Sequence, residues 1–321
     1  MSKVYYIKSK YLNTDYLKNK LKGWKEYNKK NKPTFIYYDS NYRFDKEINN
    51  YNVKLKSVVN TNNTLTNKLN LYFQLKEPKY MPKSYINPED VPFNKNSKYI
   101  LRPVEGYAGS EIYVVKTKDD LNKCMSKIRK VYKKEVLISE YIQDLMLYDD
   151  RIFHLRVYFV VSVINKKYKT YMVDYILTAR ARHKYNKNRE LNKNVYDSHL
   201  GKSSTDAIFP EDFDLKDKNK EDIRHQIIGI LHLVSKEFEK NISCYPETDN
   251  CFELLGCDFM ITKDLQVKLI EINTKVSYET HSDKTKNELS KCIFEGMYNH
   301  IINPVFNKKE ISDYNWINIY D

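Results

Sequence analysis

The chain has 321 residues, of which 41% are hydrophobic and 30% charged, and its formal net charge at pH 7 is +13. This composition excludes a disordered polyelectrolyte, and the length predicts about two domains. No apolar run is long enough to span a membrane and the start lacks the apolar core of a secretory signal, so we expect a soluble, cytoplasmic protein. The positive charge favours an acidic partner, although a Lys- and Asn-rich composition bias accounts for it equally well.

The first eighty residues predict a small α/β domain. Residues 4–7 and 34–39 are apolar and β-prone, and an amphipathic stretch with Leu17 and Leu21 lies between them. Several prolines follow within residues 77–92. Because proline interrupts regular structure, we place the first domain boundary in this segment.

Residues 81–147 predict a compact, β-rich second domain. Residues 98–104 and 111–115 are short β-branched runs, Asp119 is placed to cap a helix, and residues 137–142 read as a third strand. We therefore expect a small antiparallel sheet with one helix.

The loop between the first two of these strands suits a phosphate group. It contains two of the seven glycines of the chain, Gly106 and Gly109, and it follows the cation Arg102. Glycine lets backbone N–H groups approach phosphate oxygens, and arginine adds charge to the same anion. An ordinary hairpin turn explains two glycines as well, and on this loop alone we favour the turn.

Residues 148–321 predict the largest domain. Its expected elements are two long apolar strands at 154–164 and 168–178, a helix from Ile223 to Phe238, a hairpin at 252–261 and 266–273, and a last helix around 289–301. Sheets flanked by helices along the whole chain indicate the fold class α/β (α+β).

The cysteines predict free thiols. Their number is odd and no C-x-x-C pair occurs, which argues against a disulfide framework and against a zinc ribbon. We therefore expect buried free thiols at positions 124, 244, 251, 257 and 292.

The second hairpin carries the strongest chemical signal. Glu271 and Asn273 follow Val267 and Leu269 at intervals of two residues, which predicts that all four side chains share one buried face of a strand. Asp258 belongs to the apolar parity of the preceding strand, and a turn of about five residues puts it opposite or diagonal to Glu271, within ~4.5–8 Å. Two buried carboxylates repel unless a cation lies between them, and Mg²⁺ prefers such oxygen ligands. The alternative is a solvated sheet edge with unrelated charges.

Two polar side chains stand among apolar residues at the start of the 154–164 strand. Arg156 needs a counter-charge there, and a phosphate or carboxylate substrate would supply one. His154 lies on the same face and, taken alone, indicates only a structural histidine.

The order of these segments resembles the tubulin tyrosine ligase-like family of ATP-grasp ligases over most of the chain. The matching segments are TLTNKLNLYFQL, YILRP with GSEIYVV, LISEYIQDLML, FHLRVYFVV and, most specifically, FELLGCDFMITKDLQVKLIEIN. The resemblance implies an ATP-grasp fold with ATP held between two antiparallel sheets. The domains expected from it are 1–80, 81–147 as a central subdomain, and 148–321 with the metal-binding hairpin.

The resemblance also implies roles for particular residues. Asp258, Glu271 and Asn273 match the metal ligands, and Arg156 and Arg180 match catalytic arginines, with Arg182 as the other candidate for the second position. The positions that match ATP contacts are Lys68, Arg102, Gly106, Gly109, Ser110, Glu140, Tyr141, Ile142, His154 and Lys202.

The chain departs from the family pattern at five positions. Arg102 replaces the usual Lys, Ile152 and His154 replace a Lys and an Asp, and Gly201 and Lys202 replace the Thr and Asn of the family's His-Leu-Thr-Asn segment. Arginine keeps the charge of lysine but changes its geometry. The metal-binding hairpin is not affected by these departures.

From the resemblance we expect an ATP- and Mg²⁺-dependent ligase that adds a free amino acid to a carboxyl group of an acidic protein or peptide. The acidic C-terminal tail of tubulin is the usual acceptor of the family, and tyrosine, glutamate and glycine are all compatible as the added amino acid. One alternative is a degenerate ATP-grasp module that binds microtubules or an acidic protein. A nucleic-acid binder is a third class, but the aromatic residues form no recognisable binding motif with arginine. No membrane partner is expected.

Overall fold

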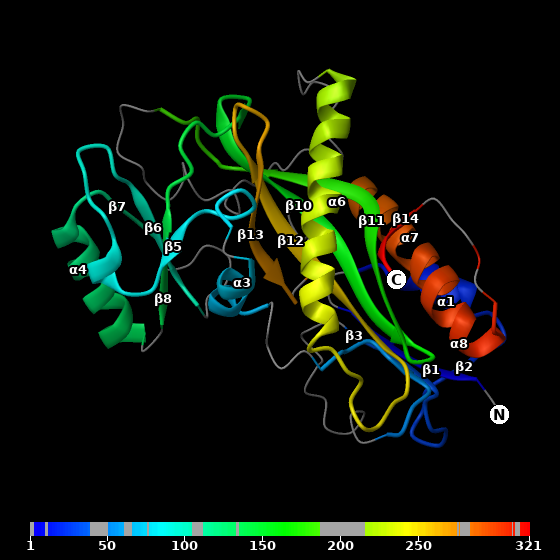
Figure 1. The fold of residues 1–321 in the computed structure, drawn as a ribbon. Coiled ribbons are helices and arrows are strands. Elements are labelled where there is room, and N and C mark those ends of the chain that lie inside the picture. The colour runs from blue at the N-terminus through cyan, green and yellow to red at the C-terminus, as the bar shows by residue number, and fades with distance from the viewer. Residues whose placement is uncertain are drawn as a thin grey trace.

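The computed structural model describes residues 3–9, 12–38, 51–60, 66–75, 77–104, 112–132, 135–186, 216–274, 276, 283–309, 311 and 315–321. Two sheets lie side by side, a large one that spans most of the molecule and a small one on the left in Figure 1. This mixed α/β architecture confirms the fold class expected from the sequence.

The large sheet contains ten strands among the described residues, in the order β14-β11-β10-β12-β4-β3-β1-β2, with β13 beside β12 and β9 beside β10. These strands are β1 (Val4–Lys8), β2 (Lys25–Glu26), β3 (Phe35–Tyr38), β4 (Leu55–Lys56), β9 (Leu147–Tyr148), β10 (Arg151–Ile164), β11 (Lys167–Arg180), β12 (Cys251–Ile261), β13 (Val267–Asn273) and β14 (Trp316–Tyr320). Strands from both ends of the chain therefore share one sheet.

β10 and β11 form the long hairpin that the sequence predicts. Its strands are antiparallel over most of their length. The turn residues Asn165 and Lys166 both have left-handed φ values, 51° and 65°. Such a two-residue turn matches the twist of the strands and sets their register.

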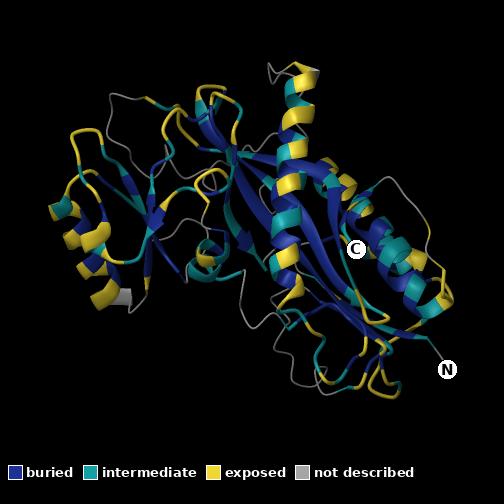
Figure 2. Cartoon of the chain, viewed as in Figure 1, coloured by how far each residue is buried: buried dark blue, intermediate teal, exposed yellow. Residues whose placement is uncertain are grey.

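Helices cover both faces of the large sheet, and the strands between them are buried (Figure 2). One face packs against α6 (Asp217–Glu239) and α3 (Lys68–Leu75), and the other packs against α1 (Asp15–Lys20), α7 (Asp283–Gly296), the π-helical turn η4 (Met297–Ile302) and α8 (Asn303–Asn307). Alternate residues of each strand enter the two cores, because successive side chains of a strand point to opposite faces.

The small sheet is antiparallel, in the order β5-β8-β6-β7, and packs against one helix. Its elements are β5 (Ser84–Tyr85), the short 3₁₀ helix η1 (Pro88–Asp90), β6 (Tyr99–Pro103), β7 (Tyr113–Val115), α4 (Lys118–Lys127), the π-helical turn η2 (Ile128–Tyr132) and β8 (Val136–Glu140). The predicted helix cap was wrong by two residues. Thr117 accepts the hydrogen bond of the Asp120 N–H, and Asp119 lies in the first turn.

The N-terminal strands are continuous with the C-terminal half of the chain. β4 pairs in parallel with the start of β12, where Lys56 lies opposite Cys251. The domain boundaries expected at residues 80 and 147 stay a proposal, because strands from the first and third expected domains share one sheet. The described residues include no helix that is both long and apolar enough to cross a membrane.

The prediction of five free thiols was wrong for two cysteines. Cys244 and Cys251 form a disulfide, whereas Cys124, Cys257 and Cys292 are free. A rule based on C-x-x-C spacing does not detect this pair, because the two cysteines are seven residues apart and meet through the loop that joins α6 to β12.

Candidate active site

A β-bulge in β13 shapes the site. Asp258 lies opposite Glu271, but Phe259 lies opposite Leu269, so Ile270 is an extra residue on β13. Ile261 lies opposite Val267, so the turn has the predicted length of five residues, and of the two predicted arrangements Asp258 and Glu271 adopt the directly opposite one.

The bulge reverses the predicted face. Val267, Leu269 and Ile272 all pack in the core beneath α6. Glu271 and Asn273 consequently point to the other face, not to the face of Val267 and Leu269 as simple alternation predicts. The physical reason is that one extra residue in a strand shifts every later side chain to the opposite side.

The three predicted metal ligands are in contact on this face. The amide Nδ2 of Asn273 donates a hydrogen bond to Asp258 Oδ2 at 3.1 Å and another to Glu271 Oε1 at 2.9 Å. Asp258 is buried, and Glu271 is partly exposed. The group therefore combines one enclosed carboxylate with one that remains open to a ligand.

Two cations neutralise the two carboxylates. Arg156, from β10, binds Asp258 in a fork through Nε to Oδ1 and through Nη2 to Oδ2, the latter at 2.9 Å. Lys68, at the start of α3, places Nζ 3.2 Å from Glu271 Oε2. Burial would lower the pKa of Arg156, but the charge and hydrogen bonds of Asp258 outweigh it and raise that pKa. His154 completes the group with Nε2 3.7 Å from Asp258 Oδ1.

Gly256 makes room for the arginine fork, a role that the sequence reading missed. A Cβ atom at this position would lie 3.1 Å from Arg156 Cδ and 3.2 Å from Nη1. The side chain of Arg156 thus crosses β12 over the bare backbone of Gly256. The available signal was a glycine inside an apolar strand, which often marks a close approach of another group.

Arg102 links the two sheets. It is buried on β6, and its Nη1 donates to the carbonyl of Ile270 at 3.0 Å while Nη2 donates to Ser139 Oγ at 3.1 Å. Burial lowers the pKa of Arg102, and the nearby charge of Glu271 partly opposes this effect. The bulge leaves the Ile270 carbonyl outside the regular ladder, where it can accept from the small sheet.

The segment after β8, which is predicted to contact ATP, lines a small cavity. Tyr141 and Ile142 border a space of about 160 Å³ together with Leu147, Tyr185 and Lys263. Burial raises the pKa of Tyr141, so its hydroxyl stays protonated. The neighbouring Glu140 accepts a hydrogen bond from the Tyr85 hydroxyl at 3.0 Å.

The structure does not bring Arg180 to this group. Arg180 lies opposite Phe153, whose side chain enters the core beneath α6, and it pairs with Asp149 at 3.0 Å above the ring of Tyr148. Arg156 is on the other face of the sheet. Of the remaining predicted contacts, Gly106, Gly109, Ser110 and Lys202 lie outside the described residues.

Comparison with known proteins identifies the family. The model of the tubulin-tyrosine ligase family matches residues 36–311. The chain belongs to the tubulin-tyrosine ligase family. A protein of Schizosaccharomyces pombe described as a probable tubulin–tyrosine ligase is 26% identical over 180 residues, which cover 53% of this chain. The chain spans 43% of the length of that relative.

Membership in the tubulin-tyrosine ligase family confirms the resemblance seen in the sequence. The family is ATP-grasp-like and generally ATP-dependent. The two sheets, the cavity at Tyr141 and the acidic hairpin are consistent with that fold.

The donor set fits a magnesium ion that is shared with a substrate. No cluster of three or more His, Cys, Asp or Glu side chains is found within the part of the chain that the structure describes. Asp258 and Glu271 supply two carboxylates, and Asn273 carries a third oxygen donor beside them. Mg²⁺ is commonly held by one or two carboxylates together with substrate phosphates, so this smaller set is sufficient.

Proposed function

We propose that the chain is an ATP- and Mg²⁺-dependent ligase that joins a free amino acid to a carboxyl group of an acidic protein or peptide. The observation that carries this proposal is the contact of Asp258, Glu271 and Asn273 on one face, with Arg156 and Lys68 beside them. A structural ion-pair network alone would not need a partly exposed carboxylate, Glu271, at the point where Arg102 of the small sheet reaches the same hairpin.

Each member of this group has a proposed role. Asp258, Glu271 and Asn273 hold Mg²⁺, which when bound supplies the charge that stabilises phosphate oxygens during phosphoryl transfer. Arg156 orients Asp258 through its fork and adds positive charge next to the transferred group. Lys68 adds the second positive charge from the α3 side.

The nucleotide is proposed to enter between the sheets. Tyr141 and Ile142 line the cavity that suits a flat base, and Glu140 ends the strand that leads to it. Arg102 brings a buried cation from the small sheet toward the same region. The other proposed nucleotide contacts are Gly106, Gly109, Ser110, His154 and Lys202.

The proposed reaction has two steps. A carboxylate oxygen of the acceptor attacks the γ-phosphorus of ATP and ADP leaves, which gives an acyl phosphate. The amine of the amino acid then attacks the acyl carbon, phosphate leaves, and the amine proton passes to solvent. Arg180 is on the opposite face, so we assign it a structural role beside Asp149.

The acceptor is proposed from charge and family. The formal net charge of +13 suits an acidic polypeptide in the cytoplasm, and the acidic C-terminal tail of tubulin is the first acceptor to test. Tyrosine is the first amino acid to test, followed by glutamate and glycine.

The test is a ligation assay on Glu271→Gln. Purified protein, ATP, Mg²⁺ and the three amino acids are incubated with tubulin and with synthetic acidic peptides, and the products are identified by mass spectrometry. We expect ligation by the wild type and none by Glu271→Gln, because the variant keeps the shape of the side chain but loses its charge. Glu221→Gln, on the exposed side of α6, is the matched control and should ligate normally.

Two outcomes would contradict the proposal. Wild-type turnover by Glu271→Gln, with an unchanged melting temperature, would remove Glu271 from the metal site. Binding of acidic peptides without any ATP turnover by the wild type would favour the alternative of a noncatalytic binding module.

A further inference from the structure

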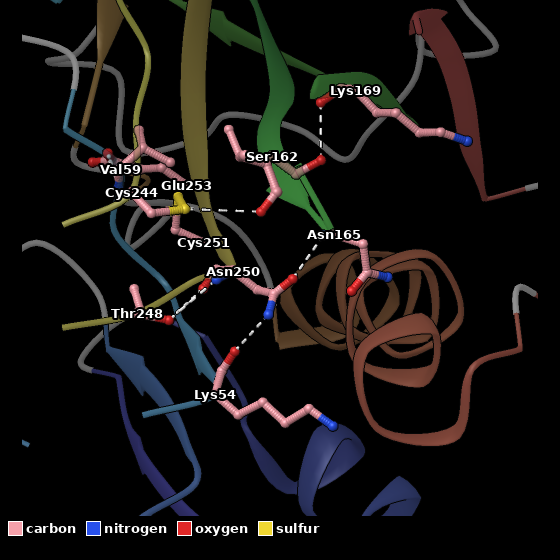
Figure 3. Close-up of a disulfide and its surroundings, with 11 residues drawn as sticks. Lys54, Val59, Ser162, Asn165, Lys169, Cys244, Thr248, Asn250, Cys251 and Glu253 are labelled. Atoms are coloured by element: carbon pink, nitrogen blue, oxygen red, sulfur yellow. Dashed lines mark hydrogen bonds between the residues drawn. A yellow bond between two sulfur atoms is a disulfide. The ribbon is translucent and has the colours of Figure 1, made fainter. Parts of the chain in front are cut away.

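The disulfide between Cys244 and Cys251 closes a short loop at a junction of the fold (Figure 3). Cys251 is fully buried as the first residue of β12, whereas Cys244 is only half-buried on the loop that follows α6. An attacking thiol would therefore meet the sulfur of Cys244 first. The Cys244 sulfur also lies 3.9 Å from the carbonyl oxygen of Val163, which offers an acceptor to a reduced Cys244 thiol.

The loop between the two cysteines holds the N-terminal strand β4. The Asn250 side chain donates from Nδ2 to the carbonyl of Lys54 at 3.0 Å, and the Asn250 carbonyl accepts from the N–H of Lys56 at 3.1 Å. The carbonyl of Glu247 accepts from the N–H of Val53 at 3.0 Å. Residues 53–56 are thus held by groups that the disulfide brackets.

Residues next to the disulfide hold the continuation of this segment. Ser243 and Asn60 exchange a pair of backbone hydrogen bonds of 3.0 and 2.8 Å, and Glu253 Oε2 accepts from the N–H of Val59 at 3.3 Å. The chain then leads to α3, whose first residue is Lys68. The anchoring of residues 53–60 therefore bears on where α3 presents Lys68.

We propose that Cys244 and Cys251 form a reversible thiol–disulfide exchange site, whose oxidised form fixes residues 53–60 and thereby holds Lys68 beside Glu271. The partners of the exchange are low-molecular-weight thiols and disulfides. The effect on Lys68 rests on the proposed function, whereas the exchange and its effect on residues 53–60 do not.

The disulfide is reduced in two exchange steps. A thiolate attacks Cys244 Sγ, the S–S bond breaks, and Cys251 leaves as a thiolate that takes up a proton. A second small thiolate then attacks the outer sulfur of the mixed disulfide, Cys244 leaves as a thiolate that takes up a proton, and the oxidised small disulfide is released. The protein disulfide gains two electrons and two protons, which the two small thiols supply. In the reverse direction the small disulfide is the oxidant.

The bond is tested first. The protein is equilibrated in glutathione buffers of increasing oxidised fraction, quenched in acid, unfolded, alkylated and mapped by mass spectrometry. We expect Cys244 and Cys251 to become protected together, while Cys124, Cys257 and Cys292 stay alkylated at every ratio. Full alkylation of the pair at every ratio, or full protection at every ratio, would overturn the proposal.

The consequence is tested by hydrogen exchange, which needs no catalytic activity. Reduction should speed exchange of the N–H groups of Val53, Lys56 and Asn60 by at least about tenfold, since their acceptors lie in the released loop or, for Asn60, directly before it. Cys244→Ser should show the fast rates in both buffers, and Cys251→Ala replaces it if the first variant fails to fold. Cys124→Ser, in α4, should respond to reduction like the wild type.

Equal exchange rates in the oxidised and reduced wild type would overturn the proposal even if the bond forms. ATP affinity, measured by calorimetry on both forms, should fall on reduction. An unchanged affinity would overturn the proposal that the disulfide holds Lys68 beside Glu271. These outcomes are separate from those of Glu271→Gln. A responsive disulfide in a protein whose Glu271→Gln variant remains active would defeat the proposed metal site and leave the exchange site standing.

Discussion

Gly256→Ala tests whether the arginine fork organises the site. The added Cβ would lie 3.1 Å from Arg156 Cδ and 3.3 Å from Nε, both closer than ordinary contacts. Arg156 cannot retreat without loosening its fork on Asp258. We therefore expect Gly256→Ala to disturb the orientation of Asp258 as well as the packing of the strand.

The size of the effect follows from two contributions. Overpacking of a core position costs about 1–3 kcal/mol, and one weakened hydrogen bond between charged groups costs roughly 1.5–3 kcal/mol. The two overlap, because a shifted Arg156 relieves the crowding at the expense of the fork. We expect a loss of about 1–3 kcal/mol in the free energy of unfolding and, since ~1.4 kcal/mol is tenfold in an equilibrium constant, about tenfold weaker binding of ATP with Mg²⁺.

The assays are urea unfolding and calorimetric titration of ATP in Mg²⁺, with two controls. Gly229→Ala in α6, where nothing lies within 4 Å of the added Cβ, should stabilise by up to about 1 kcal/mol. Ile293→Val, on the buried side of α7, should lower the free energy of unfolding by about 0.5–1.5 kcal/mol and leave the ATP affinity unchanged. Wild-type stability together with wild-type ATP affinity in Gly256→Ala would refute the reasoning.

Three further predictions concern charge. Arg102→Ala should lower both the free energy of unfolding and the ATP affinity by roughly 1.5–3 kcal/mol, because it removes the hydrogen bonds that Arg102 donates to Ile270 O and Ser139 Oγ; unchanged values in both assays would contradict this. The KM for an acidic acceptor should rise steeply as salt shortens the Debye length toward ~8 Å, while the KM for ATP moves little; equal salt sensitivity would mean that the positive charge does not select the acceptor. Burial lowers the pKa of Lys56, and the charge of Glu247 opposes this effect more weakly. The folded state therefore binds fewer protons at Lys56 than the unfolded state between the lowered pKa and the ordinary one. In that pH range the free energy of unfolding increases as pH rises. Urea unfolding from pH 7 to about 10.5 should therefore show this gain in the wild type and not in Lys56→Met.

Local sequence patterns predicted the main strands of this protein and its family. Apolar runs predicted the long strands β10 and β11, and the short turn at Asn165 and Lys166 sets their antiparallel register. The length of the turn predicted that Asp258 and Glu271 are cross-strand neighbours, because the register of a hairpin follows from its turn. The bulge at Ile270 then makes them directly opposite each other. The order of motifs along the chain indicated the family before any contact was known.

The tertiary structure alone decided how the site is assembled. The bulge at Ile270 turned Glu271 and Asn273 to the face opposite the one that alternation predicts. Lys68 and Arg156 meet the hairpin from elements far away in sequence. Such meetings depend on how helices and sheets pack, which a local period of two or 3.6 residues does not encode.

The same reason explains two placements that local patterns did not predict. Arg180 ends a strand whose parity is set by its pairing with β10, and this pairing directs it toward Asp149 and away from Arg156. Cys244 and Cys251 meet because the chain reverses between α6 and β12, so their bond reflects a three-dimensional turn and not a cysteine motif. Periodicity determined which residues form strands and helices, and packing determined which face and which partner each side chain received.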